Sequence, residues 1–165
     1  TYALELLRAV QDIDTVYVPI GLGSGICGML AARAALRSSV RVVGVVSALA
    51  PAYALSFAAG RAVSHEVSTR IADGVACSTP DPVALELIRA GVDRIVEVAD
   101  DEVEAAMCAL FSDTHSVAEG AGAAGLAALM QEQSAMRGKR VAIVVTGGNV
   151  DRDVYARVLA SAALG

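Results

Sequence analysis

The sequence has few charged and few aromatic residues, and both shortages exclude classes of protein. Charged residues make up 19% of the 165 residues, and the acidic excess gives a net charge of −5. An acidic chain without a run of lysine and arginine is unsuited to nucleic acid or to an anionic membrane surface. Aromatic residues are 4% of the chain and tryptophan is absent, which also argues against the stacking platforms that bind single strands.

Cysteine is scarce as well, at Cys27, Cys77 and Cys108. An odd number of widely spaced cysteines argues against a disulfide framework and against a zinc site, and it indicates a reducing compartment. No apolar run reaches membrane-spanning length, because arginines interrupt the most apolar region, and no secretory signal is recognisable. We therefore expect a cytoplasmic protein with no membrane partner and no nucleic-acid partner.

Small and apolar residues are abundant instead. Hydrophobic residues make up 55% of the chain, which contains 33 alanines and 15 glycines and has a mean hydropathy of +0.56. This composition supplies enough apolar surface for a sizeable core and excludes disorder. No linker or internal repeat divides the sequence, so we expect residues 1–165 to form a single domain.

Apolar runs without polar alternation predict buried parallel strands at residues 16–20, 40–46, 95–98 and 141–145. Helical patterns lie around them, at residues 4–10, 26–36, 51–59, 82–90, 100–113, 119–131 and 151–160. Strands of this kind that alternate with helices are typical of a parallel sheet covered on both faces. The predicted fold is therefore α/β, with three αβα layers and a mostly parallel sheet. Gly91 should close a helix, and residues 147–148 should form a tight turn.

A glycine-rich loop links the first predicted strand to the following helix, and it consists of Gly21, Leu22, Gly23, Ser24 and Gly25. Glycines there let backbone N–H groups turn toward one point, and the helix N-terminus adds partial positive charge. The loop therefore suits a phosphate, although a turn without a ligand is the alternative. The loop and its helix also contain G-x-G-x-x-G, but the acidic residue of a dinucleotide site is missing from the end of the second strand.

Three further residues are candidates for a site. Thr146 follows the last predicted strand and would place a hydroxyl at the C-terminal edge of the sheet, where open parallel sheets bind ligands. Gly74 lies in an Asp-Gly turn. Glu119 precedes a run of small residues that would let a ligand approach. Their alternatives are a helix cap, a surface loop and a carboxylate at a helix N-terminus.

Taken in order, these segments resemble the threonine/serine dehydratase family of fold-type II pyridoxal 5′-phosphate enzymes, to which serine racemase is related. The family carries V-P-x-G-G-G-G-x, A-D-G-x, E-P-A-G-A and S-G-G-N-x-D. This chain has VPIGLGSG, IADGVA, EGAGAAG and TGGNVD at comparable spacings over nearly its whole length. The resemblance implies the tryptophan synthase β-like fold and pyridoxal 5′-phosphate as cofactor. It also implies a homo-oligomeric full-length protein that converts a hydroxy amino acid such as L-threonine or L-serine to a 2-oxo acid and ammonia.

The same resemblance implies roles for the candidate residues. The loop from Gly21 to Gly25 would hold the cofactor phosphate through backbone amides, and Thr146 would face the pyridine nitrogen. Gly74 and Glu119 would line the pocket near the ring and the substrate. A neutral hydroxyl at the ring nitrogen fits elimination better than chemistry that needs a full electron sink.

Departures from the family pattern carry expectations of their own. Residues 47–53 hold no carboxylate where many relatives bind a divalent cation, so no metal is expected. The family's Schiff-base lysine lies in an N-terminal segment, whereas the one lysine here, Lys139, precedes the last predicted strand. We therefore expect the C-terminal portion of the cofactor-binding large domain, with the N-terminal segment and the small domain absent. The chain alone would then have no catalytic residue and would be inactive.

Three alternatives remain open at this point. The chain could be a non-catalytic α/β domain that binds a small molecule. The full-length protein could have an activity like that of serine racemase. A Rossmann-type oxidoreductase is the third, and the missing ribose-binding acid argues against it.

Overall fold

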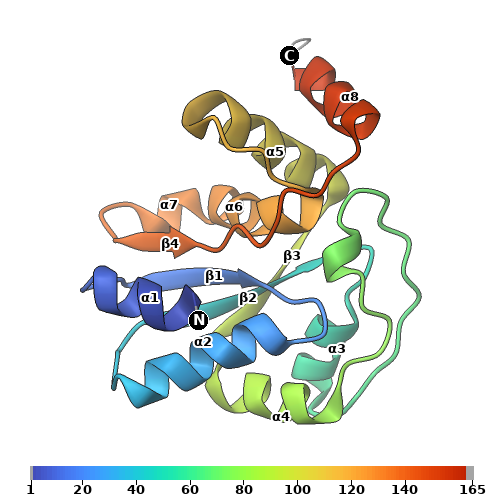
Figure 1. Cartoon of the computed structure of the whole chain (residues 1–165). Coiled ribbons are helices and arrows are strands. Elements are labelled where there is room, and N and C mark those ends of the chain that lie inside the picture. The colour runs from blue at the N-terminus through green and yellow to red at the C-terminus, as the bar shows by residue number, and fades with distance from the viewer. Residues whose placement is uncertain (1, 163–165) are drawn as a thin grey trace.

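A computed structural model describes residues 2–162, and its four strands form one parallel sheet (Figure 1). The strands are β1 (Thr15–Pro19), β2 (Arg41–Ser47), β3 (Arg94–Val98) and β4 (Val141–Ile143), in the order β3-β2-β1-β4. All three pairings are parallel, and Tyr17 of β1 lies opposite both Val43 and Ile143. Parallel neighbours bring their C-terminal ends to one edge of the sheet, which is where the candidate residues cluster.

Helices cover both faces of this sheet, as the sequence predicted (Figure 1). One layer consists of α1 (Tyr2–Ala9), α2 (Ser24–Ala35), α3 (Ala52–Ala59) and α4 (Pro82–Gly91). The other consists of α5 (Asp100–Thr114), α6 (Gly120–Gln131), α7 (Gln133–Met136) and α8 (Arg152–Ala162). Between α3 and α4 the chain is irregular apart from a 3-10 turn, η1 (Asp73–Val75). In residues 2–162, no helix combines the length and the apolar character that crossing a bilayer requires.

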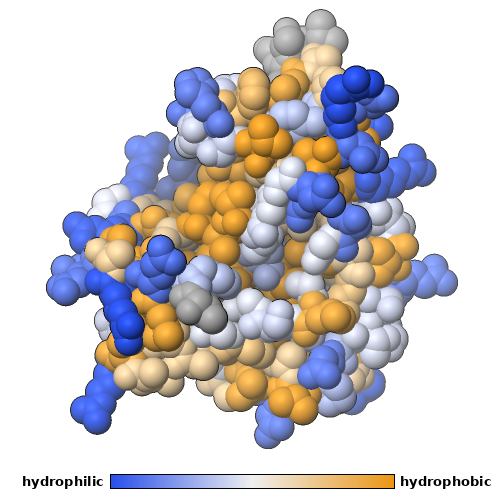
Figure 2. All heavy atoms as spheres, viewed as in Figure 1, coloured by the Kyte–Doolittle hydropathy of each residue, from blue (hydrophilic) through white to orange (hydrophobic). Residues whose placement is uncertain are grey.

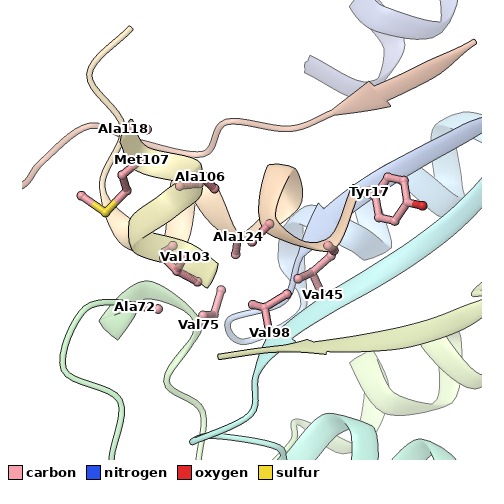
Figure 3. Packing of buried hydrophobic residues seen from close by; sticks show 14 of the residues in the cluster. Tyr17, Val45, Ala72, Val75, Val98, Val103, Ala106, Met107, Ala118 and Ala124 are labelled. Atoms are coloured by element: carbon pink, nitrogen blue, oxygen red, sulfur yellow. The ribbon is translucent and has the colours of Figure 1, made fainter. Parts of the chain in front are cut away.

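The sheet separates two apolar cores, because successive side chains of a strand point to opposite faces. Val16 and Val18 pack with Ile26 of α2 on one face. Tyr17 belongs to the other core, together with residues of α5 and α6 (Figure 3). Helix α6 contacts all four strands, and its buried residues are alanines and glycines. The abundance of small residues thus lets a helix lie close against the sheet.

Strand β4 is the least covered part of the sheet. Its three residues are only partly buried, whereas every residue of β1 is buried. Cavities of about 530, 410 and 380 Å³ lie beside it, between the strand and α1 or the helices of the other layer. Figure 2 shows apolar side chains gathered on this side of the molecule.

Four local predictions differ from the structure. Strand β4 ends at Ile143 rather than at residue 145, and α7 was not predicted. Gly91 belongs to α4 and does not adopt a left-handed conformation; a Cβ there would lie 2.8 Å from Leu30, so close packing explains this glycine. Residues 144–150 are irregular instead of containing a tight turn at 147–148. A Cβ on Gly148 would lie 2.6 Å from the Val117 oxygen, so packing again accounts for the glycine.

Candidate functional site

Three segments that are distant in the sequence meet at the C-terminal edge of the sheet and enclose a cavity of about 370 Å³. They are the loop after β1, the η1 turn and the irregular segment after β4, which contributes Thr146. The cavity is lined by Pro19, Gly21, Leu22, Gly23, Ser24, Gly25, Gly74, Val75 and Thr146. Every candidate residue except Glu119 is therefore a lining residue, and Pro19 and Val75 are additions that the sequence did not predict.

The N-terminus of α2 forms one wall of this cavity. Gly23 is its N-cap residue, with a left-handed φ of 99°, and no side chain caps the helix. The first amides of a helix have no partner within the helix, so those of Ser24 and Gly25 are available to a ligand. The first turn of α2 contains no acidic residue. The wall therefore has the partial positive charge and the free donors that an anion requires.

The loop is held against its neighbours by contacts that leave no room for a side chain at two glycines. A Cβ on Gly21 would lie 2.5 Å from the Gly74 oxygen, in the η1 turn. A Cβ on Gly23 would lie 2.7 Å from the Cβ of Ala84, in α4. The position of the loop thus depends on the absence of side chains, which is the structural reason for its glycine content.

Thr146 also lines this cavity, and it borders the cavity of about 530 Å³ between α1 and β4. Thr146 is exposed to solvent. Within residues 2–162 the Thr146 hydroxyl makes no hydrogen bond, and α8 begins six residues later, at Arg152. The structure therefore gives no support to the helix-cap alternative, and the hydroxyl is available to a ligand.

Glu119 lies beside the site rather than in its wall. Its carboxylate accepts a hydrogen bond from the Asn149 N–H (3.0 Å), and its own N–H donates to the Gly147 oxygen (3.1 Å). A Cβ on Gly74 would be 3.6 Å from the same carboxylate. Glu119 makes no side-chain cap on α6. Its two hydrogen bonds hold residues 147–149, directly after Thr146, and its carboxylate lies close to the η1 turn.

The lining residues of the cavity include no charged side chain. Lys139 precedes β4, at the end of the sheet opposite the cavity, and lines a groove with Met136 and Val141. Lys139 precedes β4 and Thr146 follows it, so the length of the strand separates the Lys139 amine from Thr146. In the part of the chain that the structure describes, no group of three or more His, Cys, Asp or Glu side chains is arranged to hold a metal ion.

A charged cluster lies elsewhere, and no sequence pattern predicted it. The Tyr17 hydroxyl and the Arg94 guanidinium both donate to the Glu132 carboxylate, with Arg94 Nε 2.9 Å from Glu132 Oε1. The Arg94 guanidinium lowers the pKa of Glu132. Burial, reinforced by Glu132, raises the pKa of Tyr17 to about 12. Because 115 residues separate Tyr17 from Glu132, only the fold could bring them together.

Comparison with known proteins agrees with this architecture. The family described as "Pyridoxal-phosphate dependent enzyme" matches residues 1–147. Over 159 residues the chain is 36% identical to the L-threonine ammonia-lyase of Thermotoga maritima, covering 96% of this chain and 39% of that protein. It is 35% identical to the catabolic L-threonine dehydratase TdcB of Escherichia coli K12, covering 92% of this chain and 46% of that protein. The chain thus spans less than half the length of these two relatives.

Solved structures give the same picture. Threonine deaminase isoform 2 of Solanum lycopersicum matches with a TM-score of 0.90 and 26% identity, over 99% of this chain and 46% of that one. Maize serine racemase matches with a TM-score of 0.85 and 30% identity, over 98% of this chain and 50% of that one. These matches confirm the predicted α/β fold of the fold-type II enzymes.

Proposed function

We propose a function from one premise: the chain belongs to the pyridoxal-phosphate dependent enzyme family. The cavity at the C-terminal edge of the sheet holds pyridoxal 5′-phosphate. The whole protein eliminates water from a hydroxy amino acid of the L-threonine or L-serine type and releases a 2-oxo acid and ammonia. The observation that carries this proposal is the meeting of the α2 N-terminus, Gly74 and Thr146 around one cavity. The relatives named for L-threonine support the choice of substrate.

The residues present fit the cofactor at both of its ends. The uncapped first turn of α2 offers amides to a phosphate and carries no acidic side chain that would repel it. The same cavity offers the hydroxyl of Thr146, which has no partner among the described residues, to a ring nitrogen. A cavity of about 370 Å³ lies within the size range of cofactor sites. Pyridoxal phosphate is a small ring with a negatively charged phosphate at one end. The free amides suit the phosphate, and the neutral hydroxyl suits the ring nitrogen.

Bound in this cavity, pyridoxal phosphate would supply an electron-withdrawing ring that makes the Cα proton of the amino acid removable. The amides of Gly23, Ser24 and Gly25 would hold the phosphate, and Pro19 and Val75 would exclude water. Thr146 would bond the ring nitrogen without protonating it, which limits electron withdrawal and favours loss of the β-hydroxyl over other outcomes. Glu119 would keep Thr146 in place through its bonds to the 147–149 segment.

The amine that moves the Cα proton has to come from another part of the whole protein. General-base catalysis needs the base within hydrogen-bond reach of that proton, and Lys139 lies at the opposite end of the sheet. We therefore infer that residues 1–165 are the C-terminal portion of the large, cofactor-binding domain. Reduction with borohydride in the presence of cofactor, followed by peptide mapping, should leave Lys139 unlabelled. Stoichiometric labelling of Lys139 would contradict this assignment.

Two finer features belong to the same proposal. Cys27, Cys77 and Cys108 are all unpaired, which supports a reducing compartment such as the cytoplasm. The homo-oligomer implied by the family resemblance stays a prediction.

A charge substitution at Ser24 tests the phosphate site without disturbing the fold. Ser24 is exposed and is the first residue of α2, where a carboxylate stabilises a helix. Ser24→Asp should therefore keep or raise the melting temperature, yet it should weaken retention of pyridoxal phosphate by at least tenfold. Ser24→Asn is the uncharged control. Gly28→Asp places the same charge on an exposed part of α2 with open space around it. Equal retention by the wild type and Ser24→Asp would contradict the proposal.

Racemisation is the second candidate, because the serine racemase match is as extensive as that to threonine deaminase. Incubating the whole protein with L-serine and L-threonine separates the two activities. Elimination gives a 2-oxo acid that a coupled dehydrogenase detects, whereas racemisation gives D-serine on a chiral column. A protein that retains the cofactor and forms neither product would instead be a non-catalytic binding protein.

A further inference from the structure

The Tyr53 hydroxyl joins three segments behind the glycine-rich loop. Tyr53 lies on α3 and is 1% exposed. Its hydroxyl donates to the Leu22 oxygen (2.9 Å) and accepts from the Asp81 N–H (3.2 Å). Asp81 in turn caps α4 by accepting from the Ala84 N–H (2.8 Å). One phenol oxygen thus connects α3, the loop after β1 and the start of α4.

This hydrogen bond determines which way one peptide of the loop faces. In a trans peptide, the carbonyl of one residue and the N–H of the next point in opposite directions. Because the Leu22 oxygen is turned into the protein toward Tyr53, the Gly23 N–H is turned away from Tyr53. The Leu22 side chain is 73% exposed and gives the loop little packing of its own. Packing holds the loop at Gly21 and Gly23, and the phenol adds a hydrogen bond that orients the peptide between Leu22 and Gly23.

The phenol is also a dependable donor. Burial raises the pKa of Tyr53, so the hydroxyl keeps its proton under ordinary conditions. Tyr53 is not among the residues that line the cavity. Any effect it has on a ligand must therefore act through the groups that its hydroxyl bonds, the Leu22–Gly23 peptide and the Asp81 N–H.

We infer that Tyr53 is a positioning residue for the anion site: its hydroxyl fixes the Leu22–Gly23 peptide so that the Gly23 amide faces the cavity. This inference rests on the proposed function for its ligand, the phosphate of the cofactor. Its observable consequence is selective. Loss of the hydroxyl should weaken ligands that carry a phosphate and spare a ligand that lacks one.

Tyr53→Phe tests this directly, because it keeps the aromatic ring and removes only the oxygen. The dissociation constants of pyridoxal phosphate and of inorganic phosphate should each rise about tenfold, the factor that a lost hydrogen bond of ordinary strength gives. The dissociation constant of pyridoxal, which has no phosphate, should not change. The ¹⁵N order parameters of residues 21–24 should fall while those of the rest of α2 stay constant.

Tyr155→Phe is the matched control. Tyr155 lies on α8, and its buried hydroxyl has no partner among the described residues. This variant should bind all three ligands as the wild type does. Equal weakening of pyridoxal and pyridoxal phosphate by Tyr53→Phe would show a merely structural role and overturn the inference, as would unchanged phosphate binding.

The same measurements separate this inference from the proposed function. A wild type that binds inorganic phosphate but not pyridoxal phosphate would contradict the proposed cofactor. The inference would still hold in that case if Tyr53→Phe weakened phosphate binding and loosened residues 21–24. Rigid 21–24 amides in Tyr53→Phe would contradict the inference even if the cofactor assignment were correct.

Discussion

Two regions of this sheet differ in whether their polar groups are paired. At the C-terminal edge, the candidate site is lined by backbone, apolar groups and hydroxyls and contains no charged side chain. Toward the N-terminal ends of the strands, Tyr17, Arg94 and Glu132 form a charged cluster, and none of the three lines the candidate site. The site leaves polar groups unpaired for a ligand, whereas the cluster pairs its polar groups with one another. Binding and stability are therefore separable in this domain, and each can be broken alone.

Glu132→Ala should give the largest effect on stability. The change removes the partner of both the Tyr17 hydroxyl and the Arg94 guanidinium. Arg94 keeps its second partner, the Asp93 carboxylate (2.7 Å). The unpaired phenol and the weakened ion pair should together lower the free energy of unfolding by about 2 to 3 kcal/mol. Denaturant unfolding measures this, and retention of pyridoxal phosphate by the folded protein should not change.

The matched control is Asp153→Ala, which breaks the fully solvated pair between Arg152 and Asp153. Exposed pairs contribute little, so the free energy of unfolding should not change. If Glu132→Ala and Asp153→Ala had the same free energy of unfolding, the Glu132 cluster would not stabilise the fold, and the prediction would be wrong.

Gly23→Ala should damage the other region. Gly23 has a φ of 99°, and its added Cβ would lie 2.7 Å from Ala84. Strain of this kind costs about 2 kcal/mol, and the displaced loop should lose the cofactor. Gly28→Ala is the control: it lies in the same helix with open space around it and should stabilise the protein slightly. Cofactor content after dialysis and unfolding free energy should therefore fall together in Gly23→Ala only.

Lowering the pH should weaken the cluster of Tyr17, Arg94 and Glu132 before it affects the candidate site. The Arg94 guanidinium lowers the pKa of Glu132 in the folded protein below its ordinary 4.5. The unfolded chain then binds a proton more readily, so this stabilisation is complete above pH 4.5 and is lost as the pH falls through the lowered value. Glu132→Gln lacks the titrating group, so its unfolding free energy should fall less steeply below pH 4.5. If the unfolding free energies of the wild type and of Glu132→Gln fell equally with pH, the pairing of Glu132 with Arg94 would be contradicted.

The sequence predicted the site better than it predicted the cluster. Strand ends and glycine loops are local signals, and a parallel sheet brings them to one edge, so Gly23 and Thr146 could be placed together in advance. Gly74 follows no strand, and only the family resemblance assigned it to the pocket. The cluster depends on side chains from β1, β3 and the end of α6, which no local pattern connects. The Tyr53 hydrogen bond to Leu22 was missed for the same reason.

Local errors came from residues used for packing. Glycines at residues 91 and 148 carry the signature of helix ends and turns, yet each fills a place where a Cβ would be too close to a neighbour. Strand β4 is shorter than its apolar run because the chain turns away from the sheet after its last bond, from the Val144 N–H to the Tyr17 oxygen. Apolarity alone could not predict that point.

Thr146 should give the smallest effect, and the most specific one. Its hydroxyl has no partner among the described residues, so removing it costs the free protein no hydrogen bond. Thr146→Val keeps the shape of the side chain and should leave the melting temperature unchanged, while the dissociation constant of pyridoxal phosphate rises about fivefold. Thr146→Ser keeps the hydroxyl and should bind as the wild type does. Thr146→Asp offers a carboxylate that would stabilise a protonated ring nitrogen, so the absorption spectrum of the bound cofactor should change. Identical spectra and affinities in all four proteins would show that Thr146 does not contact the ring, and the cofactor would then have to lie with its ring away from β4.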